Sequence, residues 1–240
     1  MTASVAARMG VVDALLADPP AVHPMDDSAD PTIGVWSTEE ACYRFLAEHC
    51  PPGTRTLEVG CGLSTVLFAA LGAQHRCVTP GLAERDRIVA YCKEHDIDTE
   101  RVVFDVESSH AALPRLQREL DGLDLVLIDG GHGFPLPIVD WFYAAPLLVP
   151  GGVLIVDDIG LPAVKLLVRF LDADPRWEQR ARTDKWAAWR RHDDSDMVED
   201  WYEQPFFTVH DTGVRAFARR VTAGATHRAR RLAKRVRGGR

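Results

Sequence analysis

Short aliphatic runs alternate along this chain with longer stretches of helical periodicity, and this alternation restricts the fold more than any other feature. Each run is too uniformly apolar for a sheet with one face in water, so helices are expected on both faces. The expected strands cover residues 54–59, 75–79, 101–104, 123–128 and 152–156. The sequence therefore predicts a doubly wound α/β fold with a mostly parallel sheet.

Helical patterns fill the intervals between these strands. Ser37 and Glu40 form a capping box, and Pro137 and Pro162 stand where first-turn prolines occur. The expected helices cover residues 37–49, 64–73, 83–96, 137–148 and 162–171, with a short amphipathic helix near the N-terminus. Residues 177–183 and 186–192 predict an antiparallel hairpin that closes the sheet.

Charge divides the chain into parts. The net charge is -7, but ten of the 28 Lys and Arg residues lie in residues 215–240, which hold no acid, so the first 214 residues carry a net charge of -17. We predict an N-terminal extension (1–35), a main domain (36–213) and a basic tail (214–240). The tail could contact nucleic acid or an anionic membrane surface, but a solvated tail, or one that folds back on the acidic body, is the favoured interpretation.

Composition indicates a soluble cytoplasmic protein. With 240 residues, 46% of them hydrophobic, the chain can bury a substantial core. No apolar run approaches the roughly 18 to 20 residues of a membrane span, and Asp13 interrupts what would be the apolar stretch of a signal peptide. The cysteines are odd in number and lack a C-x-x-C pair, so buried free thiols in a reducing compartment are expected. They are Cys42, Cys50, Cys61, Cys77 and Cys92. The oligomeric state cannot be derived from these features.

The stretch LEVGCGLST, residues 57–65, places glycines between an expected strand and an expected helix. Gly60 and Gly62 let backbone amides approach a ligand, although a tight turn without a ligand is the alternative for this motif alone. Glu58 would repel the pyrophosphate of a dinucleotide. It would instead favour the ammonium and sulfonium of S-adenosylmethionine.

The block from Thr56 to Ile159 resembles class I S-adenosylmethionine-dependent methyltransferases, most closely the bacterial branch that includes macrolide sugar O-methyltransferases. LEVGCG, DLVLIDGGHGF, a helix containing Asp140 and LLVPGGVLIVDD carry the resemblance. It implies a Rossmann-like sheet and an adenine-side contact near Asp105. The residues expected to contact the cofactor are Glu58, Gly60, Gly62, Ser64, Thr79, Asp105 and Asp129.

One position departs from the family. In the family, an acid at the end of the second strand usually accepts hydrogen bonds from the ribose hydroxyls, whereas this chain has Thr79 there. A hydroxyl accepts such bonds more weakly than a carboxylate. Glu84 could take over this role if its loop folds back.

Three aspartates follow expected strands at the edge where ligands collect in open parallel sheets. Asp129 follows residues 123–128, and Asp157 and Asp158 follow residues 152–156. If these strands are neighbours, as the resemblance implies, the carboxylates converge and favour a divalent metal, Mg²⁺ first and Mn²⁺ or Ca²⁺ next. Alternatively, Asp158 caps the next helix, Asp157 turns outward and Asp129 bonds a loop.

His132 lies three residues after Asp129 in a glycine-rich stretch. As a neutral imidazole it could accept a substrate hydroxyl proton, which makes His132 and Asp129 the expected catalytic residues. A surface histidine or a partner of Asp129 are the other interpretations. The expected reaction is direct methyl transfer to an oxygen of a small molecule. The resemblance implies a sugar or polyol hydroxyl, and a catechol-like diol would suit the same metal.

The rival hypothesis is a catalytically inactive, methyltransferase-like binding protein that acts through its basic tail. Thr79 favours it, whereas the acids at the strand ends favour catalysis. Residues 192–207 combine acids with aromatic side chains. They are expected either to line the acceptor site or to pack as a satellite of the core.

Overall fold

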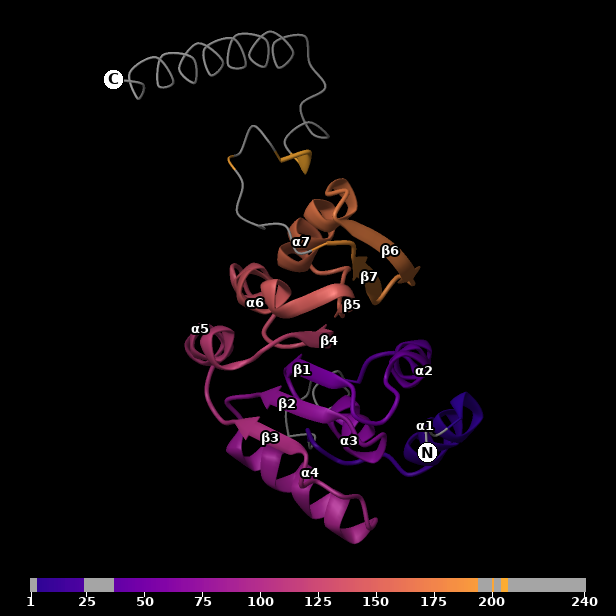
Figure 1. The fold of residues 1–240 in the computed structure, drawn as a ribbon. Coiled ribbons are helices and arrows are strands. Elements are labelled where there is room, and N and C mark those ends of the chain that lie inside the picture. The colour runs from indigo at the N-terminus through magenta and orange to yellow at the C-terminus, as the bar shows by residue number, and fades with distance from the viewer. Residues whose placement is uncertain (1–3, 24–36, 194–199, 201–203, 207–240) are drawn as a thin grey trace, which may run out of the picture. The chain divides into compact units, whose positions relative to one another are not determined.

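A computed structural model describes residues 4–23, 37–193, 200 and 204–206 of the chain (Figure 1). The helices and strands that the structure describes over residues 4–23 and 37–193 lie in the first of two compact units, Met1–Met197; the second unit is Val198–Arg240. The basic tail and most of residues 192–207 lie outside the described residues. The expectations for these segments and the three-part division therefore remain predictions.

The described part of the chain forms a seven-stranded sheet in the order β3-β2-β1-β4-β5-β7-β6. Strands β1 to β5 are parallel, β7 runs antiparallel to β5, and β6 runs antiparallel to β7. The strands are β1 (Arg55–Val59), β2 (Gln74–Val78), β3 (Val102–Asp105), β4 (Leu123–Ile128), β5 (Leu148–Val156), β6 (Trp177–Arg182) and β7 (Ala187–Arg191). The predicted Rossmann-like sheet and its closing hairpin are both confirmed.

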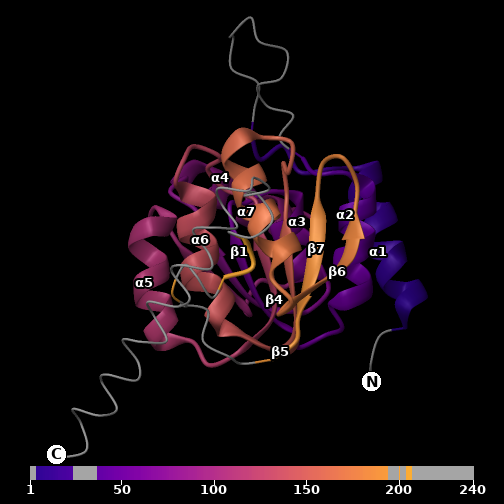
Figure 2. The same ribbon diagram turned by 90° about the horizontal axis from the view of Figure 1, so that it is seen from above.

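Helices cover both faces of this sheet, as the uniformly apolar strands predict. The helices are α1 (Val5–Ala17), α2 (Glu40–His49), α3 (Leu63–Ala70), α4 (Leu82–Glu94), α5 (Ser109–Glu119), α6 (Leu136–Ala144), α7 (Pro162–Ala173) and the 3₁₀ turn η1 (Ala145–Leu147). In Figures 1 and 2, α5 and α6 lie on one side of the strands, and α1 and α2 lie on the other.

Side chains alternate between the two layers along each central strand. Val126 and Ile128 pack with residues of α5, α6 and α7, whereas Leu125 and Leu127 pack with residues of α1 to α4. All four are at most 4% exposed. This double burial explains why the strand reads as one continuous apolar run.

The structure differs from the expectations at two places. Helix α5 is not among the expected helices, and it contains Pro114, a residue that usually interrupts a helix. The buried face formed by Ala112, Leu113 and Leu116 holds it against the sheet. The capping box at Ser37 is also absent, since α2 begins at Glu40 and its N-cap residue makes no side-chain hydrogen bond.

The expected free thiols are confirmed: all five cysteines are unpaired, four of them are buried, and Cys61 is half-buried. Within the described ranges, no helix combines the length and the apolar character that a membrane crossing requires.

The fold also contains a buried acid, Asp140, whose raised pKa lets us predict how folding stability depends on pH. Asp140 on α6 is fully buried, and burial raises the pKa of its carboxyl to about 6, with Ser109 and His110 opposing the shift. The unfolded chain loses this proton near its ordinary pKa of 3.8, whereas the folded protein keeps it until about pH 6. Folding stability should therefore fall between about pH 4 and pH 6, by on the order of 2 to 3 kcal/mol.

We expect Asp140→Asn to remove this loss. In urea denaturation, the variant should be more stable than the wild type at pH 7.5, and the difference should shrink at pH 4. A difference of equal size at both pH values would mean that the carboxyl does not titrate in this range.

Candidate functional site

The predicted site residues gather at the carboxyl edge of the parallel strands. Backbone bonds extend the sheet beyond the strand ends here: Gly60 donates its N–H to Val78, and Asp129 donates its N–H to Val59. Gly60 has a φ of +102°. A Cβ there would stand 2.8 Å from the carbonyl carbon of Asp129 and closer still to its oxygen. Only glycine therefore lets the β1 turn pass the end of β4.

The same turn opens a place for a ligand. An added Cβ at Gly62, the N-cap residue of α3, would meet nothing within 4 Å. The first N–H groups of a helix lack intrahelical acceptors and carry a partial positive charge. The turn thus offers N–H donors and open space for a ligand at the same place, as the glycine pattern predicted.

Glu58 is 1% exposed and lies beneath this turn. One carboxylate oxygen accepts a bond from the Ser64 hydroxyl, and the other accepts one from Thr65 Oγ1 at 2.6 Å. Thr65 Oγ1 in turn accepts the N–H of Gly62 at 3.0 Å, and His75 Nε2 lies 3.3 Å from Glu58 Oε2. Glu58 and Ser64 therefore shape the turn from below, and direct contact of either with a cofactor remains a prediction.

Thr79 ends the neighbouring strand and is 4% exposed. Its hydroxyl accepts the N–H of Gly81 at 3.2 Å and lies 3.4 Å from Cys61 Sγ. The carboxylate of Glu84 folds back over Gly81, where it would overlap an added Cβ. The loop thus brings a carboxylate close to the strand end that lacks one.

Asp105, expected near the adenine, is instead held in an ion-pair cluster. Arg76 donates to both of its oxygens, and Arg115 Nη2 donates to Oδ1 at 2.8 Å. Burial opposes ionisation, but these two arginines together hold the pKa of Asp105 below its ordinary value. Its carboxylate faces arginine side chains, so an adenine contact at this position remains a prediction.

Asp157 and Asp158 turn in different directions at the end of β5. Asp157 is 2% exposed, and its Oδ1 accepts the Thr38 hydroxyl at 2.9 Å. Asp158 has a φ of +51°, an uncommon conformation outside glycine, and it is half-buried. Such backbone outliers cluster at functional sites. Asp158 does not cap α7, whose N-cap residue is Leu161.

Asp129, His132 and Asp158 form the open cluster of the site. Each offers one ligand atom, and these atoms lie within 4.8 Å of one another. His132 Nε2 lies 3.3 Å from Asp158 Oδ2. Burial raises the pKa of Asp129 well above its ordinary value, with Asp157 as the next cause. The structure therefore brings His132 into the predicted group of carboxylates, while Asp157 points to Thr38.

Sequence reasoning missed two residues at this site, Thr38 and Lys185. Lys185, in the turn between β6 and β7, donates to Asp158 Oδ1 at 2.7 Å and lies 3.5 Å from Asp157 Oδ2. The hairpin itself was predicted, so the only signal in the sequence was a lysine at the tip of a hairpin paired with the acid-bearing strand.

An apolar cavity of about 380 Å³ adjoins the open cluster. It is lined by His132, Phe134, Pro162, Ala163 and Leu166. Phe134 is 72% exposed and Leu166 39% exposed. Large apolar side chains in contact with water beside a histidine favour an apolar ligand at this place.

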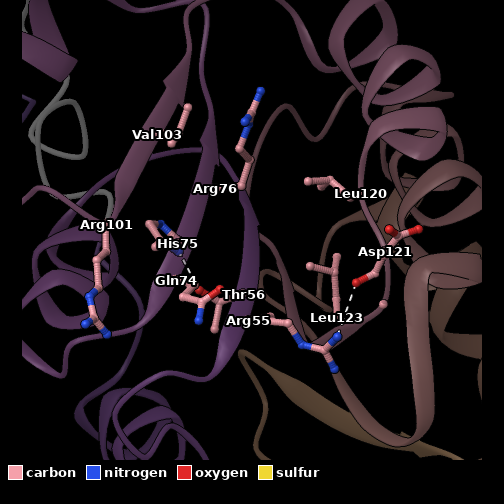
Figure 3. A pocket seen from close by; sticks show the side chains of 11 residues that line it. Arg55, Thr56, Gln74, His75, Arg76, Arg101, Val103, Leu120, Asp121 and Leu123 are labelled. Atoms are coloured by element: carbon pink, nitrogen blue, oxygen red, sulfur yellow. Dashed lines mark hydrogen bonds between the residues drawn. The ribbon is translucent and has the colours of Figure 1, made fainter.

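A second cavity, of about 240 Å³, lies at the opposite edge, where β1 to β4 begin (Figure 3). Arg55, Arg76 and Arg101 line it, but their guanidinium groups point away from one another in Figure 3. Arg55 pairs with Asp124 and Arg76 with Asp105. These arginines do not converge on a common anion, so the carboxyl edge remains the candidate site.

Comparison with known proteins finds a family match over this part of the chain. Residues 57–159 match the family model described as a methyltransferase domain. This range begins in β1 and ends just after β5, so it includes the glycine turn and the acid cluster. No curated protein matches the chain.

Several solved structures share the fold. Cofactor-bound Rv0187 from MTB is 19% identical, with a TM-score of 0.53 over 79% of this chain and 89% of that chain. The O-methyltransferase TomG from Streptomyces achromogenes, involved in tomaymycin synthesis and solved with SAM, is 15% identical, with a TM-score of 0.54 over 76% and 96%. The O-methyltransferase from Bacillus cereus, solved with SAH, is 17% identical, with a TM-score of 0.51 over 78% and 90%. At identities this low, the structural similarity shows a shared fold and nothing more.

Proposed function

We propose that this chain, whose residues 57–159 match a methyltransferase-domain model, is a class I S-adenosylmethionine-dependent methyltransferase that transfers a methyl group to a hydroxyl oxygen of a small molecule with an apolar body. One observation carries the proposal: Asp129, His132 and Asp158 lie together at the sheet edge that also bears the Gly60–Gly62 turn. That edge is where open parallel sheets bind ligands.

The residues of the turn fit the methyl donor. The free space over Gly62 and the first amides of α3 suit the carboxylate of its methionine part. Thr79 and the folded-back Glu84 provide acceptors on the β2 side, where a ribose would need them. When bound, S-adenosylmethionine supplies an electrophilic methyl group on a sulfonium.

His132 is the proposed base. Its ring is about one-third exposed, but Nε2 is buried 3.3 Å from Asp158 Oδ2, so the other ring nitrogen, Nδ1, is the one proposed to meet the substrate hydroxyl. A neutral imidazole accepts the hydroxyl proton as the oxygen attacks. The chain otherwise contributes by holding the acceptor in line with the methyl group and by excluding water.

Of the three aspartates predicted to bind a divalent ion, Asp129 and Asp158 fit it best, because they lie together beside His132. Asp157 is not part of this group. Mg²⁺ is usually held by one or two carboxylates and completes its shell with water. We propose that Asp129 and Asp158 would hold such an ion, while His132 remains available for the proton. A bound ion would stabilise negative charge on the acceptor oxygen.

The cavity beside His132 indicates the class of acceptor. Phe134, Pro162 and Leu166 offer apolar surface within reach of the base, which suits a hydroxylated ring better than a bare polyol. The reaction can be followed as label transferred from methyl-labelled S-adenosylmethionine to a panel of phenols, catechols and glycosides. Label transfer to none of them, by a folded protein, would contradict the proposal.

Metal removal gives a direct prediction for the same assay. Methyl transfer should fall to background in excess chelator and return when Mg²⁺ or Mn²⁺ is added beyond the chelator. A chelator already saturated with Mg²⁺ serves as the control. Full turnover in excess chelator would exclude the ion from the reaction.

A further inference from the structure

Lys185 stands where the sequence led us to expect a metal ion. Its ammonium donates to Asp158 Oδ1 at 2.7 Å and lies 3.5 Å from Asp157 Oδ2, so it lies between the two consecutive aspartates. Its backbone is fixed as well: Lys185 accepts the N–H of Ile159 on its carbonyl and donates its own N–H to Thr183 Oγ1. The hairpin thus holds a cation against the acid cluster.

This ammonium satisfies the carboxylates in the absence of other cations. Asp157 Oδ1 is occupied by Thr38, Asp158 Oδ1 by Lys185, and Asp158 Oδ2 faces His132. A divalent ion at Asp129 and Asp158 would therefore share a carboxylate with a positive charge a few ångströms away, and like charges repel most strongly where water is scarce.

We propose that Lys185 and the divalent ion are alternative occupants of this cluster, so that binding of the ion displaces the ammonium from Asp158. The inference rests on the metal-binding part of the proposed function. Lys185 is 30% exposed, so its side chain has a path toward solvent. It acts as a positioning residue: it holds Asp158 beside His132 without the ion and sets how much ion is needed.

The test is a titration of the full-length chain with Mn²⁺ alone, followed by the paramagnetic resonance signal of the free ion. Lys185→Met should bind Mn²⁺ about tenfold more tightly than the wild type, since the competing charge is gone. Lys185→Arg, which keeps the charge, should bind as weakly as the wild type. Lys93→Met on α4 removes a lysine exposed elsewhere and should change nothing. Lys185→Gln serves as a second neutral variant should the methionine variant not fold.

Thermal melting provides a second readout. Without Mn²⁺, Lys185→Met should melt below the wild type, because the aspartates repel one another, and Mn²⁺ should raise its melting temperature more than that of the wild type. Unchanged or weaker Mn²⁺ binding by both neutral variants, or no binding by any protein, would overturn the inference. Neither measurement uses the methyl donor or an acceptor, so failure of the methyl transfer itself would appear separately.

Discussion

Gly60→Ala should lose S-adenosylmethionine binding by about 100-fold or more, with a marked drop in melting temperature. The φ of +102° is strained for alanine, and the new Cβ would stand 2.8 Å from the carbonyl carbon of Asp129. That neighbour is backbone, fixed by the bond from Asp129 N–H to Val59 O, so it cannot move aside alone. The end of β4 and the donor turn would have to shift together.

Gly53→Ala is the matched control. Gly53 has a φ of +87°, but an added Cβ there meets nothing within 4 Å. This variant therefore shares the backbone strain without the collision and should cost about 1 kcal/mol of stability while keeping donor affinity. Calorimetry and thermal melting compare the two variants. Wild-type affinity in Gly60→Ala would show that the turn does not shape the donor site.

His132→Gln should reduce kcat by about 10²- to 10⁴-fold, since the proposed base is removed. The side chain is about one-third exposed and belongs to a loop, so the melting temperature and the affinity for S-adenosylmethionine should change little. The measurement is the rate of label transfer at saturating donor and acceptor, together with calorimetry of the donor.

His110→Gln gives the comparison for this variant. His110 is exposed on α5 and outside the site, so its replacement should leave kcat unchanged. A kcat of His132→Gln near that of the wild type would contradict the proposal. The proton of the substrate hydroxyl would then have to leave by another route, and His132 would only contact Asp158.

The sheet was predictable because burial on both faces leaves a continuous apolar signature in strands such as Leu123–Ile128. The hairpin at Trp177–Arg191 was predictable from two short runs around a turn. Helix α5 was not predictable from local sequence, because Pro114 has a very low helix propensity. Packing of Leu113 and Leu116 against the core outweighs the free-energy cost of that proline.

At the site, the sequence was enough to predict that the acids lie at the carboxyl edge of the sheet, but not which way each side chain points. Asp157 and Asp158 are adjacent, so the strand pleat and the positive φ of Asp158 send one toward Thr38 and the other toward His132. Lys185 follows Asp158 by 27 residues, and only the pairing of β7 with β5 brings it back. Such contacts depend on tertiary geometry that no local pattern records.

The most direct test of the account is a calorimetric titration of the full-length protein with S-adenosylmethionine. We expect saturable heat from one site per chain, and loss of that heat in Gly60→Ala but not in Gly53→Ala. Absence of heat at millimolar ligand would contradict it. The rival, an inactive binding protein that acts through its basic tail, would then explain the chain better.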